Sequence, residues 1–162
     1  MLRINDVYQY QDLSIRILKI LSEHIVWIDI NDVKALPEII SKTELFHAIE
    51  SFEVFRIEDP FQDIAFIQPE KDSTSQRKRD ENYNLIKNIV DHEQFYIPSA
   101  RSSLINEIIN SKKSTKQTIY RLLRQYWQRG QTPNALIPNY QNSGAKGSKK
   151  VASQKLGRKR LY

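Results

Sequence analysis

The 162-residue chain contains no cysteine, which excludes disulfides, cysteine-ligated zinc or iron–sulfur sites, and thiol nucleophiles. No apolar run reaches the ~18 residues that a membrane span requires. The first residues, MLRINDVYQYQDLS, also lack the apolar stretch of a signal peptide. We therefore expect neither membrane insertion nor secretion. The remaining composition, 40% apolar and 27% charged, is typical of a folded protein.

Glycine is absent from the first 129 residues. Phosphate-binding loops and dinucleotide-binding turns need glycine where the backbone approaches a phosphate, so neither is expected in that region. All four glycines lie near the end of the chain, at Gly130, Gly144, Gly147 and Gly157.

No group of residues typical of a catalytic or metal site is present either. The three histidines lie far apart in the sequence and have no cysteine partners, so we expect them to pack or to face solvent. The acidic pairs 58–59 and 80–81 are adjacent in the sequence, which suits turns and helix caps better than a converging site. We therefore predict no catalytic residue and no metal ligand, and we do not expect this chain by itself to be an enzyme. The histidines are His24, His47 and His92.

Acidic residues are missing after Glu107. Residues 1–107 carry 12 Lys/Arg against 19 Asp/Glu, a net charge of −7, whereas residues 108–162 carry 13 Lys/Arg and no acid. This charge distribution indicates that the second part of the chain contacts a polyanion.

Residues 2–30 alternate between apolar and polar side chains in short runs that are rich in β-branched residues. This period of two predicts a small antiparallel sheet. Apolar spacing then predicts a helix over residues 43–52, capped by Thr43, and residues 54–57 indicate one more strand. We interpret residues 1–67 as a small β-rich domain that is near the lower size limit for independent stability, and we expect it to pack against a neighbour.

Residues 68–79 (QPEKDSTSQRKR) contain no apolar side chain and predict a linker. Three amphipathic helices follow within residues 80–130, the first over about residues 79–91. The predicted fold class is therefore α+β, with a small β-rich N-terminal unit, a three-helix helix-turn-helix unit and an extended basic tail over residues 131–162.

The third of these helices has the clearest pattern. Ser114 followed by Gln117 is typical of a capping box at its start. The second helix, with Ser99 as its expected cap, is joined to it by residues 111–114, which predicts a helix-turn-helix. One face of the third helix is entirely apolar and is formed by Ile119, Leu122, Leu123, Tyr126 and Trp127.

The outer face of the third helix carries cations, amides and hydroxyls but no acid. Such side chains bond base edges in the major groove, where the N-terminal half of a recognition helix usually lies. We therefore expect residues 115–121 to read bases, and Arg124, Gln128 and Arg129 to meet phosphates. A helix face that is merely solvated would usually mix both charge signs. The candidate DNA-binding residues of this region are Lys112, Lys113, Thr115, Lys116, Gln117, Thr118, Tyr120, Arg121, Arg124, Gln128 and Arg129.

Residues 131–162 show no periodicity and are expected to be extended when alone. One interpretation is a basic arm along the DNA backbone, with residues 157–160 resembling the Gly-Arg hooks that enter narrow minor grooves. The other is a flexible end without a role in binding. The candidate DNA-binding residues of this tail are Lys146, Lys149, Lys150, Arg158, Lys159 and Arg160.

The string YWQRGQTPNALIPNY over residues 126–140, followed by residues 142–145, resembles the segment after the first helix-turn-helix of TnsB-type transposases. Residues 26–27, 59–61 and 118–123 are also similar to that family, so the resemblance spans most of the chain. It implies that the segment from Thr132 to Tyr140 runs along the DNA.

The resemblance also implies that the chain is the end-recognition fragment of a bacterial cut-and-paste transposase, cytoplasmic and associated with the nucleoid. Such transposases bind repeated sites in transposon ends and cut and join DNA with an RNase H-like domain whose Asp-Asp-Glu triad holds two Mg²⁺ ions. No residue here can be assigned to that triad, so no cofactor is expected in this fragment. The implied partners are double-stranded transposon-end DNA, further protomers, a target-selecting ATPase and, in some members, an endonuclease subunit.

A free-standing transcription regulator would carry the same helix-turn-helix and could use residues 1–67 for dimerisation or ligand binding. An Asp/Asp/Glu domain encoded after Tyr162 would favour the transposase, and a stop codon would favour the regulator. A complete nuclease or recombinase is disfavoured, because the chain has no plausible cluster of acids or histidines. The residues alone leave open whether the β-rich unit braces the DNA or contacts another protomer.

Overall fold

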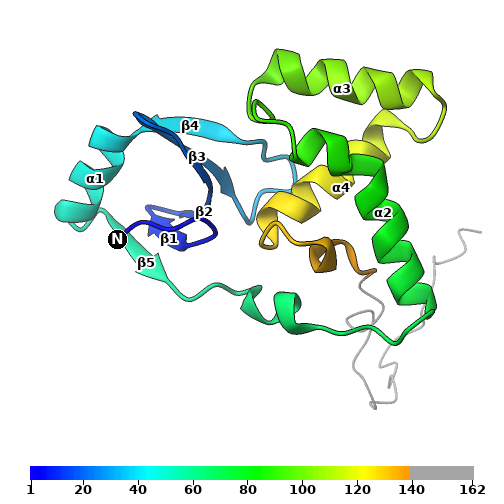
Figure 1. Cartoon of the computed structure of the whole chain (residues 1–162). Coiled ribbons are helices and arrows are strands. Elements are labelled where there is room, and N and C mark those ends of the chain that lie inside the picture. The colour runs from blue at the N-terminus through cyan, green and yellow to red at the C-terminus, as the bar shows by residue number, and fades with distance from the viewer. Residues whose placement is uncertain (139–162) are drawn as a thin grey trace, which may run out of the picture.

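A computed structural model describes residues 1–138, which form an antiparallel sheet followed by a group of helices (Figure 1). The fold class is α+β, as predicted. The sheet unit contains β1 (Val7–Tyr10), β2 (Leu13–Ile20), β3 (His24–Asp29), β4 (Glu38–Ser41), α1 (Lys42–Glu50) and β5 (Val54–Ile57). The helical unit contains α2 (Thr74–Val90), α3 (Pro98–Asn110) and α4 (Lys116–Gln128), and two 3-10 turns, η1 (Gln62–Phe66) and η2 (Pro133–Leu136), flank it.

The sheet has the strand order β4-β3-β2-β1-β5, and all neighbouring strands are antiparallel. The predicted strands and the predicted helix α1 are therefore present. Strand β4 was not predicted, because its four residues (EIIS) are too few to show a period. The N-cap of α1 is Ser41 and not the expected Thr43, since the Ser41 side chain accepts a hydrogen bond from the Glu44 backbone N–H.

Both faces of the sheet are buried, which the alternating pattern does not reveal. Ile15 and Ile17 of β2 lie in one core with residues of α1, whereas Leu18 lies in a second core with residues of the helices. The first, here called the barrel core, comprises Tyr8, Ile15, Ile17, Ile25, Leu45, Ala48 and Val54. The second, here called the helical core, includes Leu18, Val26, Ile28, Ile86, Ile89, Phe95, Ile105, Ile119, Leu122, Leu123, Trp127 and Leu136.

The helical core joins the two units, so the expectation that the small β-rich unit packs against a neighbour is confirmed. Val26 and Ile28 of β3 contribute to it from the sheet, while Ile25 points to the barrel core. Burying apolar surface is the main driving force of such packing. The helices cover one face of the sheet and α1 lies at its opposite side (Figure 1).

The linker is shorter than the sequence suggests. Helix α2 begins at Thr74, inside the segment 68–79 that lacks apolar residues. Ser73 caps it by accepting from the Gln76 N–H, and the Gln76 side chain accepts from the Asp72 N–H. The Ser73-x-x-Gln76 spacing is typical of a capping box. The helix start was nevertheless expected later, because the first turn of α2 contains no apolar residue and so shows no helical periodicity.

The segment after α4 is also more ordered than expected. Residues 131–138 are not an extended tail: η2 packs against α2 and α4, and Ala135 and Leu136 are buried. Within residues 1–138, no helix is both long and apolar enough to cross a membrane.

Candidate nucleic-acid interface

The turn between α3 and α4 is closed by a Schellman motif. The Lys112 N–H donates to the Ile109 carbonyl (3.0 Å) and the Lys113 N–H to the Ile108 carbonyl (3.4 Å). Lys112 adopts a φ of 58° at the left-handed position, where glycine is more usual. The motif stops α3 and leaves the ammonium groups of both lysines in solvent beside the start of α4.

Helix α4 begins one residue later than the predicted capping box. Thr115, and not Ser114, is the N-cap, because its hydroxyl accepts from the Thr118 N–H at 3.2 Å. The Thr115 hydroxyl also donates to the Thr118 hydroxyl at 3.0 Å. The second predicted cap is wrong as well: Ile97 precedes α3, with Pro98 as its first residue, so Ser99 lies inside the helix.

The apolar face of α4 is buried as predicted. Ile119, Leu123 and Trp127 are 0% exposed. The Trp127 ring stacks on Phe95 with ring centroids 5.6 Å apart. Because this face is fixed against α2, α3 and β3, the orientation of the opposite face is fixed too.

The N-terminal half of α4 presents its polar face to solvent. The side chains of Lys116, Gln117 and Arg121 are exposed, and those of Thr118 and Tyr120 are partly buried. No acidic residue lies between Glu107 and Pro138, so no carboxylate from this stretch neutralises these groups. Together with Lys112 and Lys113 of the turn, they form one surface of cations and hydrogen-bond donors, here called the α4 surface.

The C-terminal half of α4 behaves differently, because the sheet unit packs against it. The Gln128 side-chain amide donates to the carbonyl oxygens of Asp29 (2.9 Å) and Asp32 (2.7 Å). Helical periodicity puts Gln128 on the outer face, but the β3–β4 loop covers it there. The Gln128 amide therefore joins the two units, and its contact with a phosphate stays a prediction.

Arg124 and Arg129 are partly buried. The Arg124 Nε donates to the Ala35 carbonyl (3.2 Å), and its guanidinium lies 5.4 Å from the centroid of the Tyr120 ring. The Arg129 guanidinium lies 5.7 Å from the Phe61 ring centroid, and burial lowers the pKa of Arg129 below its usual value. Both side chains line a hollow beside α4.

A buried arginine fixes α4 to the sheet. Arg16 of β2 is 0% exposed; its Nη2 and Nη1 donate to the two carboxylate oxygens of Asp59 at 2.7 and 2.8 Å. Its Nε donates to the Gln128 carbonyl at 3.1 Å, at the end of α4. The alternating pattern places Arg16 on a solvent face, but that face of the sheet is covered by the helices, so the polar side chain is buried and satisfied.

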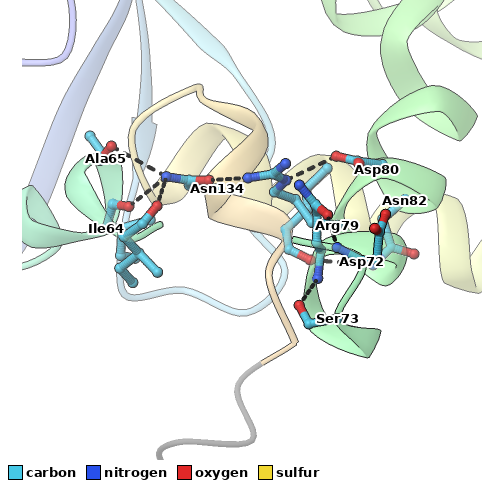
Figure 2. Close-up of polar contacts among 11 residues, drawn as sticks. Ile64, Ala65, Asp72, Ser73, Arg79, Asp80, Asn82 and Asn134 are labelled. Carbon is cyan, nitrogen blue, oxygen red and sulfur yellow. Dashed lines mark hydrogen bonds and ion pairs between the residues drawn. The ribbon is translucent and has the colours of Figure 1, made fainter. Parts of the chain in front are cut away.

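The segment after α4 is held by Asn134 (Figure 2). Its Nδ2 donates to the carbonyl oxygens of Ile64 (3.1 Å) and Ala65 (3.2 Å) around η1, and its Oδ1 accepts from Arg79 Nη1 of α2 at 3.0 Å. Asn134 therefore joins three segments: η1, α2 and its own turn η2. Residues 132–136 thus pack on the protein, and the implied path of residues 132–140 along the DNA stays a prediction.

The predicted binding residues of the tail, Lys146, Lys149, Lys150, Arg158, Lys159 and Arg160, lie outside the described residues. In the described part of the chain, no three His, Asp or Glu side chains form a group that could hold a metal ion.

Comparison with known proteins agrees with both units of this fold. Residues 1–60 match the family model of the TnsB N-terminal SH3-like domain, and residues 79–140 match that of the TnsB second domain. The chain is 39% identical over 164 residues to the transposon Tn7 transposition protein TnsB of Escherichia coli, covering 100% of this chain and 23% of that protein. It thus spans about a quarter of the length of this relative. The chain belongs to the TnsB family and corresponds to its N-terminal SH3-like and second domains.

Proposed function

We propose that the chain binds double-stranded DNA sequence-specifically at repeated sites in the ends of a transposon. It would serve as the N-terminal recognition part of a cut-and-paste transposase. The observation that carries this proposal is the α4 surface: an exposed, acid-free helix face directly after a tight turn.

The arrangement of α3 and α4 suits a helix-turn-helix in which α4 is the recognition helix. Lys116, Gln117 and Arg121 are exposed on α4 and would read base edges in the major groove. Lys112 and Lys113 of the turn would contact the phosphate backbone. Membership of the TnsB family favours a transposase over a free-standing regulator.

On this proposal, catalysis would be performed by a region that corresponds to the part of the relative outside the match. The same holds for Mg²⁺ and for contacts with a target-selecting ATPase and an endonuclease subunit. Other protomers would bind neighbouring repeats. Binding to DNA would associate the protein with the bacterial nucleoid.

The test compares duplexes taken from the two ends of the element that encodes the chain with scrambled duplexes of the same length. We expect a marked preference for the element ends and a footprint that repeats along them. Arg121→Ala should lower affinity for the footprinted site by about 1–3 kcal/mol and relax base preference at one position.

The control is Lys87→Ala, which removes an exposed cation of α2 away from the α4 surface. Equal affinity of the wild type for element ends and scrambled duplexes would contradict the proposal. Equal loss on both duplexes in Arg121→Ala would show that Arg121 contacts phosphate only.

A further inference from the structure

Four polar residues form a stripe at intervals of four: Gln117, Arg121 and Gln125 of α4, and its C-cap Arg129. Residues spaced in this way share one face of a helix. The stripe changes along its length, because Gln117 and Arg121 are exposed whereas Gln125 and Arg129 are partly buried. The helix thus protrudes at its N-terminal end and is recessed at the other.

The recessed half has walls from both units. Val33 of the β3–β4 loop stands on one side, and Lys78 and Asn82 of α2 stand on the other. The two hollows, of about 330 and 430 Å³, share Arg121, Gln125 and Arg129 and so adjoin along α4. Together they form one open groove, here called the α4 groove.

Among residues 1–138, the lining of this groove contains no carboxylate. It includes Lys78, Asn82, Arg121, Arg124, Gln125 and Arg129. Four of these side chains are cations. Among residues 1–138, neither Lys78, Arg121 nor Arg129 pairs with an acid.

Arg129 differs in this respect from the other buried arginines. Arg16 is paired with Asp59, and Arg101 donates to the Phe95 carbonyl at 3.1 Å. Arg129 lies against the Phe61 ring and is partly desolvated, yet within residues 1–138 its guanidinium makes no ion pair with an acid. A partly buried charge without a partner is costly, so such a group is suited to an anionic ligand that supplies the missing acceptors.

We propose that the α4 groove is a phosphodiester-binding site that holds one strand of the DNA backbone while the protruding end of α4 enters the major groove. This inference rests on the proposed function. Lys78 would contact a phosphate from the α2 wall, and Arg129 would contact a phosphate from the floor of the groove, where it lines both hollows. Gln125 would donate its amide between them.

The experiment measures how affinity for an element-end duplex and for a scrambled duplex depends on salt, using the whole chain. Each lost phosphate contact makes the slope of log K against log salt concentration shallower by about 0.9. Lys78→Gln and Arg129→Gln should each show this change, by the same amount on both duplexes, so that base preference is retained.

Lys87→Gln is the matched control. Lys87 is also an exposed cation of α2, but it lies nine residues beyond Lys78, about half a turn around the helix, and does not line the groove. Its slope should equal that of the wild type. A neutral methylphosphonate can replace single phosphates of the footprinted site. At one such phosphate position, and not at others, the wild type and Lys78→Gln should then have the same salt slope.

The outcomes separate this inference from the proposed function. If the wild type prefers element ends while Lys78→Gln and Arg129→Gln keep its slope, the groove does not bind phosphate and the proposed function stands. If the wild type shows no preference but the two slopes become shallower, the groove is supported and sequence-specific recognition fails. Should Arg129→Gln lose its folded circular dichroism signal, the exposed Lys78 decides the question.

Discussion

Arg16 and Asp59 form a two-bonded ion pair, with nitrogen–oxygen distances of 2.7 and 2.8 Å, and the same guanidinium donates to the Gln128 carbonyl. This single side chain therefore connects β2, the segment after β5 and the end of α4. Because α4 carries the proposed recognition surface, the pair fixes that surface relative to the SH3-like domain.

Arg16→Met should lower the free energy of unfolding by about 3–5 kcal/mol, because it leaves the Asp59 carboxylate partly buried without its partner. Urea denaturation followed by circular dichroism measures this. The control is Lys87→Met, which removes an exposed cation of α2 that pairs with no acid within residues 1–138. That loss should stay below about 1 kcal/mol, and equal losses in the two variants would contradict the structural role of Arg16.

The pair also predicts a dependence on pH. Burial by itself raises the pKa of Asp59, but hydrogen bonds from Arg16 and the Phe61 N–H, together with the Arg16 charge, outweigh it and hold the pKa below the ordinary 3.8. A carboxyl group with a depressed pKa in the folded state stabilises the fold above its unfolded pKa. That stabilisation is lost as the pH falls through the folded pKa.

The difference in unfolding free energy between wild type and Asp59→Asn should therefore be largest above about pH 5 and shrink below about pH 4. Urea titrations at several pH values measure it. Asp12→Asn, in an exposed turn, is the control and should show a much smaller pH-dependent difference. A difference for Asp59→Asn that stays constant down to pH 3 would argue against the ion pair.

Two glutamines of α4 should separate stability from recognition. Gln128→Ala removes hydrogen bonds to the Asp29 and Asp32 carbonyls, so we expect a loss of stability of about 1–3 kcal/mol. Gln117→Ala should leave stability unchanged, because this side chain is exposed, and should weaken discrimination at one base by about 1–3 kcal/mol. The reverse result would mean that Gln128 and not Gln117 faces the DNA.

Two truncations should distinguish the tail from the folded part. A chain that ends after Pro138 loses seven Lys/Arg but keeps Leu136, which is 0% exposed in the helical core. It should fold with unchanged stability and bind all DNA more weakly, with a slope shallower than the roughly −5 to −7 expected if six to eight phosphates are contacted.

A chain that ends after Gly130 also loses buried Ala135 and Leu136, so its stability should fall by several kcal/mol. Thermal unfolding of both truncations measures this difference. An unchanged salt slope after removal of residues 139–162 would show that the tail does not contact DNA.

The elements that could be predicted are those whose signal is local. The apolar stripe from Ile119 to Trp127 predicts α4 and its buried face, because helical spacing places those residues together whatever surrounds them. Gly130 follows the C-cap of α4 with a φ of 112°, a conformation that glycine adopts readily. The helix caps were predicted less well. The N-caps are Ser41 and Thr115 and not the nearby hydroxyl residues that we expected, because a sequence pattern does not distinguish between them.

Long-range packing could not be predicted. Arg16 and Gln128 are polar residues on faces that look solvated, and each is covered by a segment more than 90 residues away in the sequence. The sequence does not indicate that Lys78 and Asn82 line a groove, because the groove forms only when α2, α4 and the β3–β4 loop pack together.

Charge and periodicity are properties of neighbouring residues, so the amino-acid order alone reveals the acid-free second part of the chain, the alternation of the sheet and the amphipathic α4. Which part of the polar face of α4 is free depends instead on how the two units pack. The sheet unit is too small to bury its own surface on both sides, so it packs against the helices. That packing covers Gln128, recesses Arg129 and leaves Gln117 and Arg121 exposed.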